Sequence, residues 1–400
     1  MNTPPPSRRG SARLPVPPAV RMHKLLDKKR VVLCVGCGGV GKTTTSAALA
    51  LAMARAGKRV ICLTIDPAKR LANSLGLERM TEEAKVIEAS VFEAAGVKVS
   101  GSLTVMMLDT KRTFDDIVRK HASTDKARDA ILNNKIYQYV STSLAGTQEY
   151  MAMEKLQALR EEGAYDLIVL DTPPTANALD FLDAPERMVE AIDSPAMRWF
   201  VQAFSGKSGR VAFGLLGKGS QLVFKAIGKI TGGEFLDDLA GFIAAINDLF
   251  GGFTERAKRV SEALRSPDVA FVLVTSPDPM AIEEINFFAD RLREFAMPRD
   301  AFVVNRVHAA PPAGTPERVS SDLVAAGLAP SEPLLAALAR AAEDARLLSL
   351  RDAENLGRLR TGSGARVDEK DALVLHVPAF DGDVHDVSSL ARVGEILIGA

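Results

Sequence analysis

Short apolar runs rich in β-branched residues recur along the chain and are separated by segments with helical spacing of apolar positions. The runs comprise residues 31–35, 59–65, 103–109, 167–170, 269–276, 301–307 and 373–377. Apolar runs without polar alternation are typical of strands that are buried on both faces of a parallel sheet. The pattern therefore predicts an α/β fold with a mainly parallel sheet and helices on both faces. Helical spacing also covers residues 81–95, and a last helix is expected at about 387–398.

The first apolar run leads into a glycine-rich segment with the spacing of a phosphate-binding P-loop. Gly36, Gly41, Lys42 and Thr43 occupy the fixed positions of G-x-x-x-x-G-K-[ST], and a helix is expected from Thr43 onward. Glycines allow backbone N–H groups to approach a phosphate, the lysine adds a positive charge, and the threonine hydroxyl suits Mg²⁺. A glycine turn without a ligand is the alternative. The order strand, loop, helix favours a nucleotide site.

Two further strands end in a carboxylate, where α/β sheets place their ligands. Asp66 follows the run at 59–65, and Asp171 follows the run at 167–170. Asp66 is a candidate for positioning the attacking water, and Asp171 is a candidate Walker B carboxylate that holds Mg²⁺ through water. Each aspartate has an ordinary alternative role as a helix N-cap. The P-loop earlier in the chain favours the magnesium role for Asp171.

The β pattern is interrupted between residues 184 and 266, where helical segments carry many large apolar residues. We expect this region to be a helical insertion, and its aromatic residues either form ordinary core or line a groove for an apolar partner. The expected organisation is a disordered, basic, Pro-rich tail at 1–28 and a P-loop ATPase domain in two parts, 29–183 and 267–400, on either side of the insertion.

Composition limits the classes of partner and the cellular compartment. Fifty basic residues balance fifty acidic ones, so no overall field favours nucleic acid as a partner. The cysteines are Cys34, Cys37 and Cys62, which is too few for a disulfide framework and fits a reducing cytoplasm. No apolar run reaches the roughly eighteen residues of a membrane span. We expect a cytoplasmic protein, with a peripheral position at a membrane left open.

Five segments together resemble one known family. They are GGVGKTTT, DPAKRLANSLG, MMLDTKRTFDDIV, GTQEYMAMEKL and DTPPTANALDFLDAP. On these segments the chain resembles the ArsA-type ATPases, which include the arsenite-pump ATPase and a relative that targets tail-anchored membrane proteins. They belong to the wider class of dimeric P-loop ATPases with the MinD and ParA proteins. The resemblance covers most of residues 30–398, is greatest to the bacterial single-domain branch, and implies a dimeric Mg²⁺-dependent ATPase.

The resemblance also assigns roles to individual residues. Asp66 corresponds to the switch I aspartate that orients water, and Asp171 to the switch II and Walker B aspartate. Asn305 lies where the family holds adenine, and the loop with Pro378 and Phe380 resembles the one that closes over the base. The phosphate loop would comprise Gly36, Gly38, Gly39, Val40, Gly41, Lys42, Thr43 and Thr44, with Lys42 catalytic, Thr43 on Mg²⁺ and Thr44 near the α-phosphate.

The chain departs from the family pattern in four places. Cys37 stands where the family signature has a lysine that reaches the phosphates of the partner subunit. No cysteine follows Cys62, so the family's downstream zinc pair is missing and no zinc is expected. The arsenite-binding cysteines of the pump have no counterpart either. The segment DTPPTANAL lacks the Gly-His that often follows the family's threonine.

Three functions remain in competition on the sequence alone. The favoured one is a dimeric Mg²⁺-ATP switch whose ATP cycle controls the handling of an apolar protein client. The second is an ATP-binding regulatory subunit, slow or inactive in hydrolysis, in a heterodimer with a paralogous ATPase. The third is a small-molecule kinase, which would need an acceptor pocket and an arginine-bearing lid.

Overall fold

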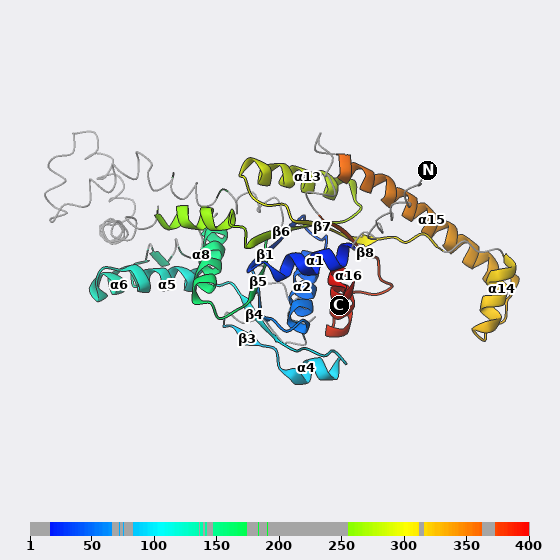
Figure 1. Ribbon diagram of the computed structural model, residues 1–400, viewed down its shortest axis with the longest axis horizontal. Coiled ribbons are helices and arrows are strands. Elements are labelled where there is room, and N and C mark those ends of the chain that lie inside the picture. The colour runs from blue at the N-terminus through cyan, green and yellow to red at the C-terminus, as the bar shows by residue number, and fades with distance from the viewer. Residues whose placement is uncertain are drawn as a thin grey trace, which may run out of the picture.

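The computed structural model describes residues 17–65, 72, 75, 83–135, 137–138, 141, 147–173, 183, 190, 255–311, 316–361 and 373–399. These residues form an eight-stranded sheet with the order β3-β4-β2-β5-β1-β6-β7-β8 (Figure 1). All neighbouring strands pair in parallel except β3, which is antiparallel to β4. The strands are β1 Val31–Gly36, β2 Arg59–Thr64, β3 Lys85–Val86, β4 Ser102–Met107, β5 Leu167–Asp171, β6 Val269–Thr275, β7 Ala301–Val307 and β8 Leu373–Pro378.

Helices cover both faces of this sheet, and alternating residues of each central strand point to opposite cores. In β1, Val32 and Cys34 belong to one core, whereas Val31, Leu33 and Val35 belong to the other. This period of two explains why a strand covered on both sides shows no polar alternation in sequence. The predicted α/β class with a mainly parallel sheet is therefore confirmed.

The first core lies between the sheet and α1, α2 and α16, and the second contains α8, α13 and the end of α15. A helical segment at 255–264 also packs into the second core through Ala257, Val260 and Leu264. The helices are α1 Pro18–Asp27, α2 Lys42–Arg55, α4 Ala89–Ala94, α5 Thr110–His121, α6 Asp125–Leu132, α8 Thr147–Glu162, α13 Pro279–Glu294, α14 Pro316–Ala325, α15 Glu332–Thr361 and α16 Val387–Ile398.

Two segments differ from the expected elements. Residues 18–27, predicted as part of a disordered tail, form α1, whose Met22 and Leu26 are fully buried. A proline at the first helical position and two apolar residues four apart explain this helix. Within 81–95, predicted as one helix, the structure has the short strand β3 followed by α4. The tail prediction is thus wrong for residues 18–27.

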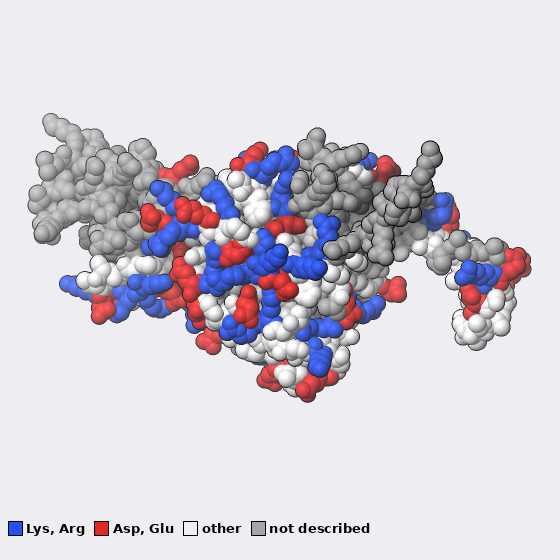
Figure 2. All heavy atoms as spheres, viewed as in Figure 1, with Lys and Arg blue, Asp and Glu red and all other residues white. Residues whose placement is uncertain are grey.

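The long helix α15 projects away from the sheet and carries α14 at its outer end (Figure 1). Only its inner part enters the body of the protein, where Asp352, Asn355 and Leu359 are buried. Basic and acidic side chains are intermixed over the described face in Figure 2. Among the described helices, none has the length and apolar character required to cross a bilayer.

Most of the expected insertion at 184–266 lies outside the described residues, which include only residue 190 and the stretch from 255 in that range. The domain boundaries proposed from the sequence therefore stay predictions.

Candidate functional site

The glycine-rich loop joins the carboxyl end of β1 to the N-terminus of α2. A Cβ atom on Gly36 would lie 2.0 Å from the carbonyl oxygen of Val274 in β6, so the strand–loop junction requires glycine. Gly39 and Gly41 have φ angles of 79° and 95°, a region that disfavours L side chains. A Cβ atom on Gly38 would have no described neighbour within 4 Å, so space is left beside the loop there. The loop geometry thus fits the predicted P-loop.

Lys42 bridges this loop from the first turn of α2. Its Nζ donates a hydrogen bond of 2.7 Å to the carbonyl oxygen of Cys37, and its side chain is buried. The ammonium group therefore lies across the loop, where it is held for contact with an anion that the loop would bind.

The predicted magnesium ligands meet at the end of β5. Thr43 Oγ1 donates to Asp171 Oδ2 at 2.7 Å, and Thr64 Oγ1 donates to the same oxygen at 3.2 Å. Asp171 is 1% exposed. A carboxylate and a hydroxyl side by side form the hard oxygen donor set that Mg²⁺ prefers, so these two residues fit the ion.

The segment that follows Asp171 starts in a fixed position. Thr172 Oγ1 donates to the carbonyl oxygen of Cys34 at 2.9 Å, which ties the loop to β1. Residues 174–182 of this segment lie outside the described residues. Asp66 also lies outside them, so its predicted role in positioning water remains a prediction.

A pocket of about 760 Å³ extends from this loop along the carboxyl ends of β7 and β8. Six of the predicted site residues line it: Gly41, Thr43, Thr44, Asn305, Pro378 and Phe380. Asn305 Nδ2 also donates to the carbonyl oxygen of Val40 at 2.9 Å, which connects the pocket wall to the phosphate loop. The Arg392 guanidinium lies 5.0 Å from the centre of the Phe380 ring. The pocket therefore joins the expected phosphate and base sites.

Arg306, His308 and His385 also line the pocket, although the sequence did not mark them as site residues. Arg306 has a left-handed φ of 60°, next to a register irregularity between β7 and β8. Asp352 accepts a 2.8 Å hydrogen bond from the backbone N–H of His308 and also contacts its ring Nδ1. None of the three belongs to a motif, and the one weak signal was that His308 directly follows β7, because ligands bind outside the carboxyl ends of such strands.

The cysteines of this region are buried. The thiol of Cys37 is directed at the first turns of α13, with Sγ 3.5 Å from the carbonyl oxygen of Ala281. Burial raises the pKa of the Cys34 thiol to about 12, and it also raises that of Cys62. A thiol with so high a pKa is a poor nucleophile and a poor metal ligand at neutral pH.

Comparison with known proteins places these features in context. A model of the ArsA ATPase family, described as anion-transporting ATPase, matches residues 29–319. The chain is 25% identical to the protein named ATPase get3 of Aspergillus terreus over 290 residues, which is 72% of this chain and 76% of that protein. It is 26% identical over 292 residues to ATPase GET3 of Ajellomyces dermatitidis and to that of Blastomyces gilchristii, with the same shares covered. These relatives are fungal, so the expected bacterial branch stays a prediction.

Proposed function

Since the chain belongs to the ArsA ATPase family and is an ATPase, we propose that it acts as a Mg²⁺-ATP-dependent dimeric switch. In this proposal, binding and hydrolysis of ATP control the handling of an apolar protein client. The observation that supports it most is the contact between Thr43 and Asp171, because Thr43 also lines the pocket that Asn305 and Phe380 line.

The described residues have distinct parts in the proposed reaction. The loop amides and the Lys42 ammonium bind the phosphates and stabilise the charge that develops on them. Thr43 and Asp171 would hold Mg²⁺, which supplies positive charge against the phosphate oxygens. Asn305, Pro378 and Phe380 would contact the base. We assign Asp66 the positioning of the water, since it follows the apolar run at 59–65 that includes β2.

Replacement of Asp66 tests the hydrolytic role. Asp66→Asn should retain ATP binding and lose turnover, because an amide cannot accept the proton of the attacking water in the same way. Lys42→Ala is the control that should weaken binding itself. Phosphate release and the affinity for a fluorescent ATP analogue are measured on both variants. Normal turnover of Asp66→Asn would remove this residue from the mechanism.

Cys37 is the observation that favours the second candidate, a slow or inactive subunit paired with a paralogous ATPase. The family resemblance puts a lysine at this position, and removal of a cation of this kind from a transition state costs about 10³ to 10⁵ in rate. The Cys37 side chain instead points at α13. Lys69 or Arg70 could replace the missing charge, and both lie outside the described residues.

Turnover of the purified chain and of Cys37→Lys separates the two candidates. A slow homodimer that lacks only this cation should gain at least about tenfold in turnover from Cys37→Lys, whereas Cys37→Ala should gain nothing. Rapid hydrolysis by the unmodified chain would instead exclude the inactive subunit. Sedimentation with and without ATP and Mg²⁺ measures whether the chain forms a dimer by itself.

The client and the location are supported by the resemblance and by the apolar residues between 184 and 266. A synthetic peptide with a single apolar helix of about 20 residues is the appropriate probe. It should bind the intact protein in a nucleotide-dependent way, as measured by fluorescence anisotropy. Equal binding with ATP, with ADP and without nucleotide would contradict a switch. A cytoplasmic location, with peripheral association with a membrane, is part of the same proposal.

A further inference from the structure

A second pocket lies between α5, α8 and the helical segment at 255–264. It has a volume of about 140 Å³ and shares no lining residue with the nucleotide pocket. Five basic side chains line it: Lys120, His121, Lys155, Arg256 and Arg259. They come from three helices that are far apart in sequence, so the fold gathers them at one place.

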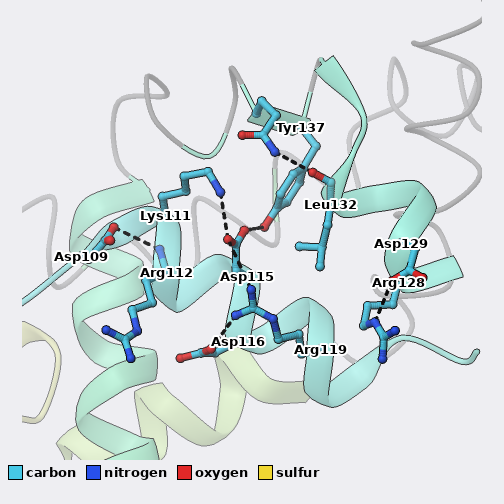
Figure 3. Close-up of polar contacts among 11 residues, drawn as sticks. Asp109, Lys111, Arg112, Asp115, Asp116, Arg119, Arg128, Asp129, Leu132 and Tyr137 are labelled. Carbon is cyan, nitrogen blue, oxygen red and sulfur yellow. Dashed lines mark hydrogen bonds and ion pairs between the residues drawn. The ribbon is translucent and has the colours of Figure 1, made fainter. Parts of the chain in front are cut away.

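Carboxylates on α5 are already engaged with other groups. Asp116, which lines the pocket, accepts a 3.1 Å hydrogen bond from Arg119, which does not line it (Figure 3). Its neighbour Asp115 accepts hydrogen bonds from Lys111 at 2.8 Å and from the Tyr137 hydroxyl at 2.6 Å. The charge of Asp116 is therefore balanced from outside the pocket.

The other two carboxylates of the pocket have partners within it. Glu154 lies 3.6 Å from Arg256 Nε and accepts a hydrogen bond from the Tyr150 hydroxyl. Glu161 lies 4.0 Å from Lys120 Nζ. Arg256 is 7% exposed and so forms part of the pocket's inner wall.

Lys155 and Arg259 are the lysine and arginine side chains of the pocket that take no part in these ion pairs. Among the described residues, neither has a carboxylate within 4.0 Å. In the described part of the chain, two positive charges of this pocket thus have no carboxylate within ion-pair distance. Arginine forks and lysine ammonium groups are the usual ligands of phosphate oxygens in proteins.

The pKa of the His121 imidazole is consistent with an excess of positive charge in this pocket. Its pKa is lowered, and burial is the largest cause. The positive charges of Arg256, Lys120 and Arg259 lower it further, and only Glu161 opposes them. Net positive charge therefore surrounds this ring.

We propose that this pocket binds one phosphate-type oxyanion, either free phosphate or the phosphate group of a small molecule. The Lys155 and Arg259 cations match the charge of about −1.5 to −2 that a phosphate group carries near pH 7. The volume is sufficient for one such group, since a water molecule occupies about 30 Å³ in the liquid. The site is separate from the ATP pocket and does not depend on the client that we propose.

Inorganic phosphate is the probe, and the Lys42→Ala chain is the test protein, because its weakened P-loop limits binding at the nucleotide site. The pKa of His121 is followed by NMR on ring-labelled histidine, with the signal assigned through its loss in His121→Gln. Bound phosphate should raise this pKa, because a nearby negative charge favours the imidazolium ion. A simple ion site is expected to have a dissociation constant in the millimolar range. If phosphate at up to about 50 mM leaves the His121 pKa unchanged, the proposal is overturned.

A pair of charge variants in the same background provides the matched control. Lys155→Gln with Arg259→Gln should weaken phosphate binding at least about tenfold, because two charge-assisted contacts are lost. Lys126→Gln with Lys135→Gln removes two charges outside the pocket and should leave the affinity unchanged. Equal affinities in the two double variants would overturn the proposal.

Circular dichroism confirms the folding of each variant, and single replacements at 155 and 259 serve if a double variant does not fold.

Glycerol phosphate, titrated in parallel, distinguishes free phosphate from the phosphate group of a small molecule as the ligand. Tighter binding than inorganic phosphate assigns the site to a phosphorylated small molecule, and weaker binding assigns it to the free ion.

Discussion

The contact between Gly41 and Asn305 determines the shape of the phosphate loop at its C-terminal end. A Cβ atom on Gly41 would lie 2.2 Å from Asn305 Nδ2, at a residue whose φ is 95°. The Asn305 amide donates to the carbonyl of Val40, 265 residues earlier in the chain. Glycine is thus required here for two reasons, backbone conformation and the space taken by the asparagine side chain.

Gly41→Ala should reduce the affinity for ATP by about 100-fold or more, because the loop must move away from its phosphate-binding conformation. In an Asn305→Ala background, the same change should cost less, since the collision at 2.2 Å is removed while the φ strain remains. Isothermal titration with Mg²⁺-ATP measures all four proteins of this cycle. Purely additive losses would mean that Asn305 does not restrict the loop.

Sequence reasoning located the residues whose type and spacing are set by local chemistry. The P-loop glycines, Lys42 and Asp171 follow from strand–loop–helix order, and the structure puts Thr43 and Asp171 in direct contact. Arg306 and His308 could not be found in this way. Their position in the pocket depends on the irregular pairing of β7 with β8, which is a long-range feature.

At the scale of the elements, α2 packs closely against α16, which follows it by more than 300 residues in the sequence. The buried face of α2 is rich in alanine, and Gly394 of α16 lies against it. A Cβ atom on Gly394 would be 3.0 Å from both the Ala48 carbonyl oxygen and the Ala52 Cβ. A Cβ atom on Gly357 in α15 would have no described neighbour within 4 Å.

Alanine substitutions at these two glycines should have opposite effects. Gly357→Ala should raise the free energy of unfolding by about 0.5–1 kcal/mol, because glycine in a helix costs this amount relative to alanine. Gly394→Ala should lower it by about 1–2 kcal/mol, since overpacking costs about 1–3 kcal/mol and exceeds the helical gain. Urea unfolding measures both. Stabilisation by Gly394→Ala would show that the two helices separate easily.

An ion pair links Arg59, the first residue of β2, to Asp166, the residue before β5, and its contribution to stability depends on pH. Arg59 donates to Asp166 from its backbone N–H and from its guanidinium at 2.8 Å each. These side-chain and backbone hydrogen bonds lower the pKa of Asp166 from 3.8 to about 2. Because the folded-state pKa is below the unfolded one, the pair stabilises the protein above about pH 4 and loses this effect as the pH falls toward 2.

Asp166→Asn should therefore reduce the free energy of unfolding at pH 6 by about 0.2–1 kcal/mol, the range of exposed pairs. The difference from the unmodified protein should shrink at pH 3. Urea titrations at the two pH values measure it. A difference that is the same at both values would contradict an ionic contribution from this pair.

Strand prediction succeeded along the parallel sheet because doubly covered strands are uniformly apolar. It failed for β3, whose two exposed residues pair with Val105 and Thr104 at the sheet edge and carry no such pattern. Helix α1 was missed because Pro-rich flanking sequence resembles a tail. Its contacts with α16 and β8, which hold Met22 and Leu26 in the core, are not visible in the local sequence.

At the scale of the whole molecule, α15 belongs to two environments. Its inner part is fixed by Asp352, which binds the His308 N–H, and by Asn355, whose Nδ2 donates to the carbonyl of Pro277 at 2.9 Å. Its outer part exposes Leu347 and Leu350, each 53% exposed. A single helix thus includes both buried and solvent-facing turns, and its outer part projects away from the sheet (Figure 1).

Hydrogen exchange should divide this helix into two parts. Amides in 335–350 should exchange at least about tenfold faster than those in 352–359, because few tertiary contacts oppose local opening there. Mass spectrometry of peptic peptides, with the isolated chain in solution, measures this ratio. Uniform protection along α15 would mean that another surface covers the outer turns.

The nucleotide pocket takes one wall from residues 41–47 and the opposite wall from residues 378–393. A nascent polypeptide still attached to the ribosome at residue 360 possesses the glycine loop but not β8, the Phe380 segment or α16. Such a chain lacks all the pocket-lining residues from Pro378 to Val393. The complete pocket can therefore form only after residues 378–393 have been synthesised, and a product that stops before them lacks the side of the pocket that includes Phe380.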